Sequence, residues 1–250
     1  MKRKIYFLGS KEIGLDCLKF LYENKDLFSI EIKAVFSNNR MLYKNSTDIK
    51  SFAQKNKIPF FLNQEALQKL PPPDYMISVQ YHEIINSEFL QKVKILPLNL
   101  HMAPLPKYRG CNQFSFAIFN KEEFFGTTLH VMDPKIDHGD ILFQKVFKIH
   151  SNFAYLLYKQ TVDESFKLFK EKINLIFSGH YPMISQSSLD VKPSFYLRSD
   201  IENIKIIKSD MPIEEQKLRF RSTFFPPFDP PSMIKGNEKI YLDMDWYNNI

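Results

Sequence analysis

Short apolar runs separated by polar, helix-like stretches mark most of this chain. The runs that predict strands cover residues 4–8, 30–36, 59–62, 75–79, 95–101, 127–132 and 141–149. Between two of them, apolar side chains recur at helical spacing at Ile13, Cys17, Phe20 and Leu21. Further helices are expected over 48–55, 64–70, 111–120 and 153–177. Strands that alternate with helices predict an α/β fold on a mainly parallel sheet, with helices on both of its faces.

The pattern changes near residue 180. Periodicity weakens there and prolines accumulate, as in residues 223–231. Two short runs within 233–241 are expected to form a β-hairpin that turns at Gly236-Asn237. We therefore expect a domain of residues 1–180 and a small C-terminal lobe of residues 181–250. The apolar hairpin could join two copies of the chain as a homodimer.

Composition excludes several classes of protein. Of 250 residues, 44% are hydrophobic, enough for a sizeable core. No apolar run is long enough to span a membrane, and the run after the basic residues 1–4 is short for a secretory signal. Cys17 and Cys111 fall in predicted helices and lack metal-ligand spacing. A cytoplasmic protein without a metal or a membrane partner is expected.

Net charge bears on the choice of partner. The charge is +6 and the sequence pI is about 9.0, which could attract nucleic acid or a diphosphate-bearing substrate. The lysines are scattered along the chain, however, as on an ordinary solvated surface. No nucleic-acid partner is expected on this ground.

An amide, an imidazole and a carboxylate stand near the ends of two predicted strands. Asn99 and His101 are two residues apart, so at a strand end their side chains point to one side, and Asp137 follows a later strand. Attack of an amine on a formyl carbonyl builds negative charge on the oxygen, which an amide N–H or an imidazolium can stabilise. Histidine can also move the proton, and a carboxylate would favour its protonated form. These three groups suit formyl transfer to an amine.

The surrounding sequence resembles the N10-formyltetrahydrofolate-dependent formyltransferases. That family's pattern is Asn-x-His, Leu-Pro-x-x-x-Gly, Gly-Thr, and a loop with Asp before Gly. The matching residues here are Asn99, His101, Leu105-Pro106, Gly110, Gly126-Thr127 and 137–139. The resemblance covers residues 1–177 and continues more weakly to the end of the chain. It implies a Rossmann-like domain, N10-formyltetrahydrofolate as co-substrate, and Asn99, His101 and Asp137 as the catalytic residues.

The resemblance also implies where folate binds. In that family the segment matching residues 79–84 helps to hold the pterin, together with backbone around the Asp137 loop. Folate contacts are thus expected from Gln80, Tyr81, His82, Glu83, Ile84, Asp133 and Ile136. Tyr81 and His82 follow a buried strand at its C-terminal end, where open α/β sheets bind ligands.

Within the family, the chain looks like nucleotide-sugar N-formyltransferases in residues 8–12, 78–82 and 221–227. Methionyl-tRNA formyltransferases carry a glycine- and lysine-rich insertion where residues 37–44 stand here, and a C-terminal barrel for which residues 181–250 are short. The resemblance implies a dTDP-linked amino-dideoxysugar substrate in O-antigen lipopolysaccharide synthesis. It favours a 4-amine, as in dTDP-4-amino-4,6-dideoxyglucose, over a 3-amine.

Substrate contacts are expected from Ser10, Lys11, Tyr108, Arg109, Tyr196 and Phe225. Ser10 begins a helix whose free N–H groups suit anionic oxygens, and Arg109 could clamp a diphosphate. Tyr196 and Phe225 could stack on the base. Each also has a purely structural interpretation, as a turn, a solvated charge or a packed ring.

Other assignments stay open. His130 lies inside a predicted strand and is expected to be structural. A methionyl-tRNA formyltransferase-like enzyme is one alternative function. A non-catalytic binding protein with the folate-enzyme fold is another, although an intact set of Asn99, His101 and Asp137 argues against it.

Overall fold

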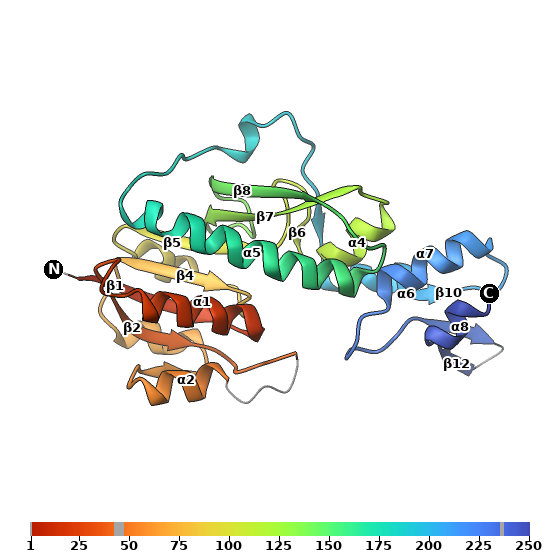
Figure 1. The fold of residues 1–250 in the computed structure, drawn as a ribbon, viewed down its shortest axis with the longest axis horizontal. Helices are drawn as coiled ribbons and strands as arrows, with labels where there is room; N and C mark the ends of the chain where they lie inside the picture. The colour runs from red at the N-terminus through yellow and green to blue at the C-terminus, as the bar shows by residue number, and fades with distance from the viewer. Residues whose placement is uncertain (1, 43–47, 236–237) are drawn as a thin grey trace. The chain divides into compact units, whose positions relative to one another are not determined.

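The computed structural model describes residues 2–42, 48–235 and 238–250, which form two compact units (Figure 1). Unit 1 comprises Met1–His101, Thr127–Lys145 and Glu164–Asp190. Unit 2 comprises Met102–Gly126, Val146–Asp163 and Val191–Ile250. Each unit therefore gathers segments that are far apart in the sequence.

This division differs from the expected boundary at residue 180. Residues 181–190 belong to unit 1, whereas Met102–Gly126 and Val146–Asp163 pack with the C-terminal residues. Three long elements contribute residues to both units: strands β7 (Phe124–Val131) and β8 (Ile141–Lys148) and helix α5 (Ala154–Phe177). Periodicity marks each of these as one element, but it does not say which of its residues pack together.

Unit 1 is organised by a mostly parallel sheet. Its seven strands lie in the order β3-β2-β1-β4-β5-β7-β8. The first five are β1 (Arg3–Gly9), β2 (Ile30–Phe36), β3 (Phe60–Phe61), β4 (Tyr75–Val79) and β5 (Leu96–His101). They pair in parallel, and β7 is antiparallel to β5. The predicted α/β class with a mainly parallel sheet is confirmed.

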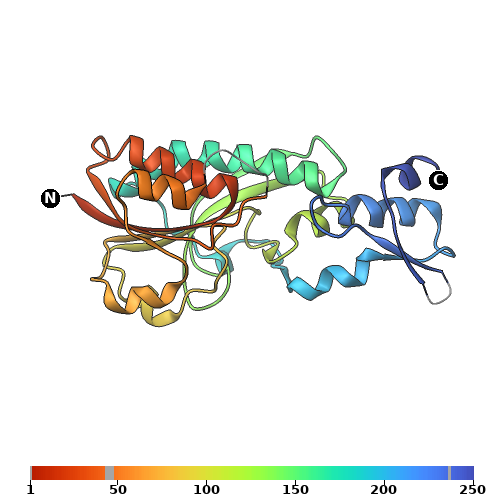
Figure 2. The same cartoon turned by 90° about the horizontal axis from the view of Figure 1, so that it is seen from below.

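Helices cover both faces of this sheet. Helix α1 (Lys11–Glu23) and α5 lie along one face, where Phe20 of α1 meets Phe166 and Phe169 of α5 edge-on (Figure 2). Helices α2 (Ile49–Lys55), η1 (Gln64–Lys69) and α3 (Ser87–Gln91) complete the layers. Tyr6 and Leu8 of β1 pack with residues of η1 and α3, whereas Ile5 and Phe7, of the opposite parity, are also fully buried. Burial of both parities is what a sheet covered on both faces requires.

Unit 2 contains two small sheets. Strand β6 (Arg109–Gly110) pairs in parallel with β9 (Phe195–Tyr196). Strands β10 (Ile206–Ile207), β11 (Ser232–Lys235) and β12 (Glu238–Tyr241) form the other, and β11 and β12 are antiparallel. The expected hairpin is therefore confirmed, and its turn at Gly236-Asn237 lies outside the described residues. The helices are α4 (Gln113–Phe119), η3 (Arg198–Ile201), α6 (Glu202–Lys205), α7 (Ile213–Thr223) and α8 (Met244–Asn248).

Two local predictions need correction. The helix expected over 111–120 begins at Gln113, because Asn112 has φ 57° and a left-handed residue cannot continue an α-helix. Cys111 therefore precedes the helix instead of lying in it. Helix α7 was not predicted, because its exposed face is strongly polar and few apolar positions mark its period. No helix within the described residues has the length and apolar character needed to cross a membrane.

Candidate active site

The candidate site lies on the polar C-terminal end of β5 and on the paired residues of its antiparallel neighbour β7. Asn99 and His101 lie on one face of β5, as their two-residue spacing predicts. The register places His130 directly opposite Asn99 and Thr128 opposite His101. Directly opposed residues share a face of the sheet, so these four polar side chains gather on one face. Gln144 of β8 donates to the Thr128 hydroxyl at 3.0 Å.

The loop that follows β7 carries Asp137 in a left-handed conformation, with φ 51°. Two contacts hold this loop within unit 1. Gly139 lies so close to Val131 that an added Cβ would stand 2.1 Å from the Val131 carbonyl oxygen. Gln186, in helix η2 (Gln186–Ser188), donates through Nε2 to the carbonyls of Asp137 at 3.0 Å and Gly139 at 2.8 Å. The loop thus folds back over the strand ends.

One carboxylate oxygen of Asp137 lies close to three polar side chains of β5 and β7. Asp137 Oδ1 lies 3.5 Å from His101 Nδ1, 3.5 Å from His130 Nε2 and 3.4 Å from Asn99 Nδ2. The side chains of His101 and Asp137 are 6% and 11% exposed. The three residues predicted to be catalytic therefore converge at a nearly dry site, where charge–charge interactions are strong. Their catalytic role stays a prediction.

Buried hydroxyls support the end of β5 from behind. Thr127 donates to the His101 carbonyl at 3.1 Å, and Ser165 of α5 donates to the Thr127 hydroxyl at 2.7 Å. Both hydroxyl residues are fully buried. This chain fixes the backbone from which the His101 imidazole projects.

His130 is the residue that sequence reasoning left out of the site. Its side chain is 2% exposed, and its Nε2 lies 3.1 Å from Asn99 Nδ2. No pattern in the sequence marks it, because its place opposite Asn99 depends on the antiparallel register of β5 and β7. It is part of the polar cluster, and its expected structural role stays a prediction.

The residues expected to hold folate form a hydrogen-bonded segment after β4. Tyr81 donates to Glu83 Oε2 at 2.9 Å, and the same oxygen accepts from the Gln64 backbone at 3.0 Å. Burial, and then the bond to Glu83, raise the pKa of the Tyr81 phenol far above 10.0. His82 Nε2 lies 3.6 Å from Glu83 Oε1, and the Ile84 side chain is exposed.

Other expected folate contacts lie on the Asp137 loop. Asp133 faces His138 Nδ1 at 2.9 Å and accepts from the Lys135 backbone at 3.0 Å. Ile136 is exposed. The structure thus places two groups of expected folate residues in unit 1, and their contacts with folate stay predictions.

Ser10 and Lys11 stand at the start of α1, next to the segment after β4. Ser10 is buried and donates to Asn38 Oδ1 at 3.0 Å. Lys11 has φ 61° and donates through Nζ to Gln80 Oε1 at 2.7 Å. Gln80 itself has φ 54°. A residue expected to bind substrate and one expected to bind folate are therefore in direct contact.

The remaining expected substrate contacts lie in unit 2. Tyr108 is buried, and its hydroxyl donates to Glu122 Oε1 at 2.8 Å. Burial raises the pKa of Tyr108 far above its ordinary range. Its ring stacks with that of Tyr196 at a centroid distance of 5.8 Å, Phe225 contacts Tyr158, and Arg109 pairs with β9. These rings pack within unit 2, and their contact with substrate stays a prediction.

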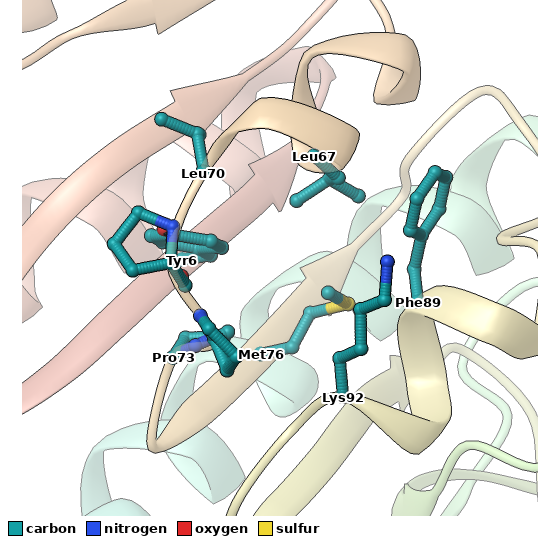
Figure 3. A pocket seen from close by; sticks show the side chains of 9 residues that line it. Tyr6, Leu67, Leu70, Pro73, Met76, Phe89 and Lys92 are labelled. Carbon is teal, nitrogen blue, oxygen red and sulfur yellow. Dashed lines mark hydrogen bonds between the residues drawn. The ribbon is translucent and has the colours of Figure 1, made fainter.

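A small cavity of about 10 Å³, room for roughly one water, lies on the face of the sheet that η1 and α3 cover (Figure 3). Tyr6, Met76, Phe89 and Lys92 are among its lining residues, and none of the predicted site residues is. It is too small for a folate or a sugar nucleotide. Within residues 2–42, 48–235 and 238–250, no group of three or more His, Cys, Asp or Glu residues could hold a metal ion.

Residues 25–170 match the family model described as formyl transferase. The chain belongs to the formyl transferase family. Membership confirms the expected class of enzyme, one that transfers formyl groups, and the matched range includes Asn99, His101 and Asp137.

Curated relatives of this formyl transferase include enzymes that act on tRNA. The methionyl-tRNA formyltransferase of Clostridioides difficile is 27% identical over 215 residues, which are 82% of this chain and 70% of that protein. Those of Borrelia turicatae and Clostridium tetani are matched over 65% and 58% of their lengths. The chain thus spans about two thirds of the length of these relatives.

Solved structures with this formyl transferase fold include sugar enzymes. An N-formyltransferase from Helicobacter canadensis, in complex with folinic acid and dTDP-3-aminofucose, has a TM-score of 0.75 at 23% identity, over 96% of this chain and 86% of that one. A 4-N formyltransferase from Francisella tularensis gives 0.74 at 20% identity over 96% of each chain. A methionyl-tRNA formyltransferase from Clostridium thermocellum gives 0.63 at 16% identity, over 95% and 90%. These likenesses establish the shared fold.

Proposed function

We propose that this formyl transferase moves the formyl group of N10-formyltetrahydrofolate to the amine of a dTDP-linked amino-dideoxysugar. The observation that carries the proposal is the meeting of Asn99, His101 and Asp137 at one carboxylate oxygen, within 3.5 Å. An amide donor, an imidazole and a carboxylate are the groups that acyl transfer to an amine needs. Folinic acid in the Helicobacter canadensis enzyme supports a folate donor.

The proposed chemistry follows from this arrangement. The neutral sugar amine attacks the formyl carbon, and the carbonyl oxygen becomes an oxyanion. Asn99 and the protonated His101 donate hydrogen bonds to that oxygen. Asp137 favours the imidazolium and, through water, helps to carry the proton from the attacking nitrogen to N10. The carbonyl group then re-forms and the bond between the formyl carbon and N10 breaks. The formyl group stays on the sugar nitrogen, and N10 leaves with the proton.

The sugar class is favoured by similarity along the whole chain. The two sugar N-formyltransferases have higher TM-scores than the methionyl-tRNA enzyme, 0.75 and 0.74 against 0.63. One of them carries a dTDP-linked 3-aminosugar, and another is described as a 4-N enzyme. We commit to the 4-amine of dTDP-4-amino-4,6-dideoxyglucose, used in O-antigen lipopolysaccharide synthesis. A cytoplasmic location and a homodimer through the β11–β12 hairpin complete the proposal.

A second candidate is formylation of methionyl-tRNA, because the curated sequence relatives bear that name. Mass spectrometry separates the candidates. The protein is incubated with N10-formyltetrahydrofolate and a panel of dTDP-linked 3- and 4-aminosugars, with methionyl-tRNA in parallel. A single formyl adduct on the 4-aminosugar is the expected result. Formylation of the tRNA alone would replace the proposal with the second candidate.

Two variants test the site. His101→Ala and Asp137→Asn remove the imidazole and the carboxylate charge, and each should lower kcat by at least about a hundredfold. Folate binding, followed by fluorescence titration, should survive in both. His150→Ala and Asp163→Asn change exposed residues and serve as matched controls with unchanged turnover. Turnover like that of the wild type in His101→Ala or Asp137→Asn would refute the catalytic role proposed for these residues.

A further inference from the structure

The proposed reaction assigns no role to His130, although its imidazole lies among the side chains of Asn99, His101 and Asp137. Its ring is buried and stands edge-on to that of His101, at a centroid distance of 6.3 Å. Both ring nitrogens have partners. Nδ1 lies 2.8 Å from the carbonyl oxygen of Val131. Nε2 lies 3.1 Å from Asn99 Nδ2 and, farther away, 3.5 Å from Asp137 Oδ1.

The nearest partner of each ring nitrogen favours one protonation state of the ring. A carbonyl oxygen can only accept, so the Nδ1 of His130 must carry a hydrogen to bond to Val131. Asn99 Nδ2 can only donate, so the Nε2 of His130 must present its lone pair. Both conditions are met by the neutral imidazole with its proton on Nδ1. An imidazolium would also carry an N–H on Nε2, which Asp137 Oδ1 could accept at 3.5 Å but which would face the N–H of its nearer neighbour, Asn99 Nδ2, at 3.1 Å.

We propose that His130 is a positioning residue that fixes the amide of Asn99 through this Nδ1-protonated, neutral tautomer. The inference rests on the proposed formyl transfer. With one hydrogen of Nδ2 taken by His130, the second faces Asp137 Oδ1 at 3.4 Å, longer than an ordinary hydrogen bond. That hydrogen is free to shift to the oxyanion as it forms. A flipped amide would instead turn its oxygen toward a lone pair and a carboxylate.

Two variants separate positioning from packing. In His130→Asn the shorter amide can still donate to the Val131 carbonyl but does not reach Asn99. In His130→Gln the longer amide can place an oxygen near the position of Nε2 and accept from Asn99. His130→Asn should lower kcat by about a hundredfold, the cost of a misplaced group, with KM for both substrates little changed. His130→Gln should recover much of the loss.

A double-mutant cycle with Asn99→Ala tests whether the effect passes through Asn99. Once the Asn99 amide is absent, His130→Asn should add little further loss of kcat, because the two residues act as one unit. Equal kcat losses in His130→Asn and His130→Gln, or losses that simply add to that of Asn99→Ala, would show that the ring merely fills space. Thermal unfolding of each variant identifies those that fail to fold.

A measurement without turnover keeps the inference testable on the wild-type protein. Long-range ¹⁵N–¹H correlation spectra of protein labelled at the histidine nitrogens distinguish the two neutral tautomers from the imidazolium. The Nδ1-protonated form is expected for His130 at neutral pH, assigned by its loss in His130→Gln. The other tautomer or an imidazolium would overturn the inference. Absence of formyl transfer by the wild type, with the expected tautomer present, would overturn the proposed function instead.

Discussion

Gln186 is predicted to hold the Asp137 loop in place, and Gln186→Leu tests this directly. The residue is 4% exposed, and its Nε2 donates to the carbonyls of Asp137 and Gly139. Leucine has a similar volume and no donor, so the substitution removes the two hydrogen bonds while leaving little empty space. The residue lies beyond the range of the family match, residues 25–170, and no motif in the sequence marks it.

The size of the effect follows from burial. A lost hydrogen bond costs about 1 kcal/mol, and a carbonyl left buried without a donor costs about 1–3 kcal/mol. The bond to Gly139 is buried and the bond to Asp137 is partly buried, so water can replace the second more easily. Gln186→Leu should therefore lower the free energy of unfolding by about 2–3 kcal/mol. It should also lower kcat by about a hundredfold, because the Asp137 carboxylate loses its fixed place.

Urea unfolding followed by circular dichroism measures the first effect, and formyl-transfer kinetics measure the second. Gln54→Leu, an exposed position on α2, is the matched control and should change neither. A Gln186→Leu protein with the stability and the kcat of the wild type would refute the reasoning. Lower stability with unchanged kcat would show that the loop holds Asp137 without the help of Gln186.

Two further predictions concern the same unit. Gly139→Ala places a Cβ 2.1 Å from the Val131 carbonyl oxygen, so the loop must shift. We expect the free energy of unfolding, measured in urea, to fall by about 1–3 kcal/mol, and kcat to fall as well. An unchanged free energy of unfolding and an unchanged kcat would contradict the close approach of Gly139 to Val131. Hydrogen bonds from Lys145 and Lys167 lower the pKa of Glu164 below its ordinary value of 4.5. These ion pairs therefore stabilise the fold above pH 4.5, and this stabilisation is lost as the pH falls through the lowered pKa. Glu164→Gln should then cost up to about 1 kcal/mol at pH 7 and nothing in strong acid, a difference that unfolding at both pH values measures.

The sequence by itself determined most of the layered core of unit 1. Strands β2 and β4 match their predicted ranges. The short run of β4 is apolar except for Ser78 and is buried throughout, whereas β2 alternates buried residues with exposed Glu31 and Lys33 before it ends in three buried residues. The two-residue spacing of Asn99 and His101 placed both on one face of β5, since side chains alternate along any strand. These are local properties, and the family motif added Asp137 to them.

Tertiary structure alone decided what surrounds those residues. His130 reaches Asn99 because β7 runs antiparallel to β5 in one register, and Gln186 reaches the Asp137 loop from a helix 49 residues farther along the chain. The division into two units, each with residues of β7, β8 and α5, could not be predicted from the sequence either. The physical reason is the same in each case. Periodicity records which face of an element is buried, whereas pairing and register depend on contacts between segments that the sequence keeps far apart.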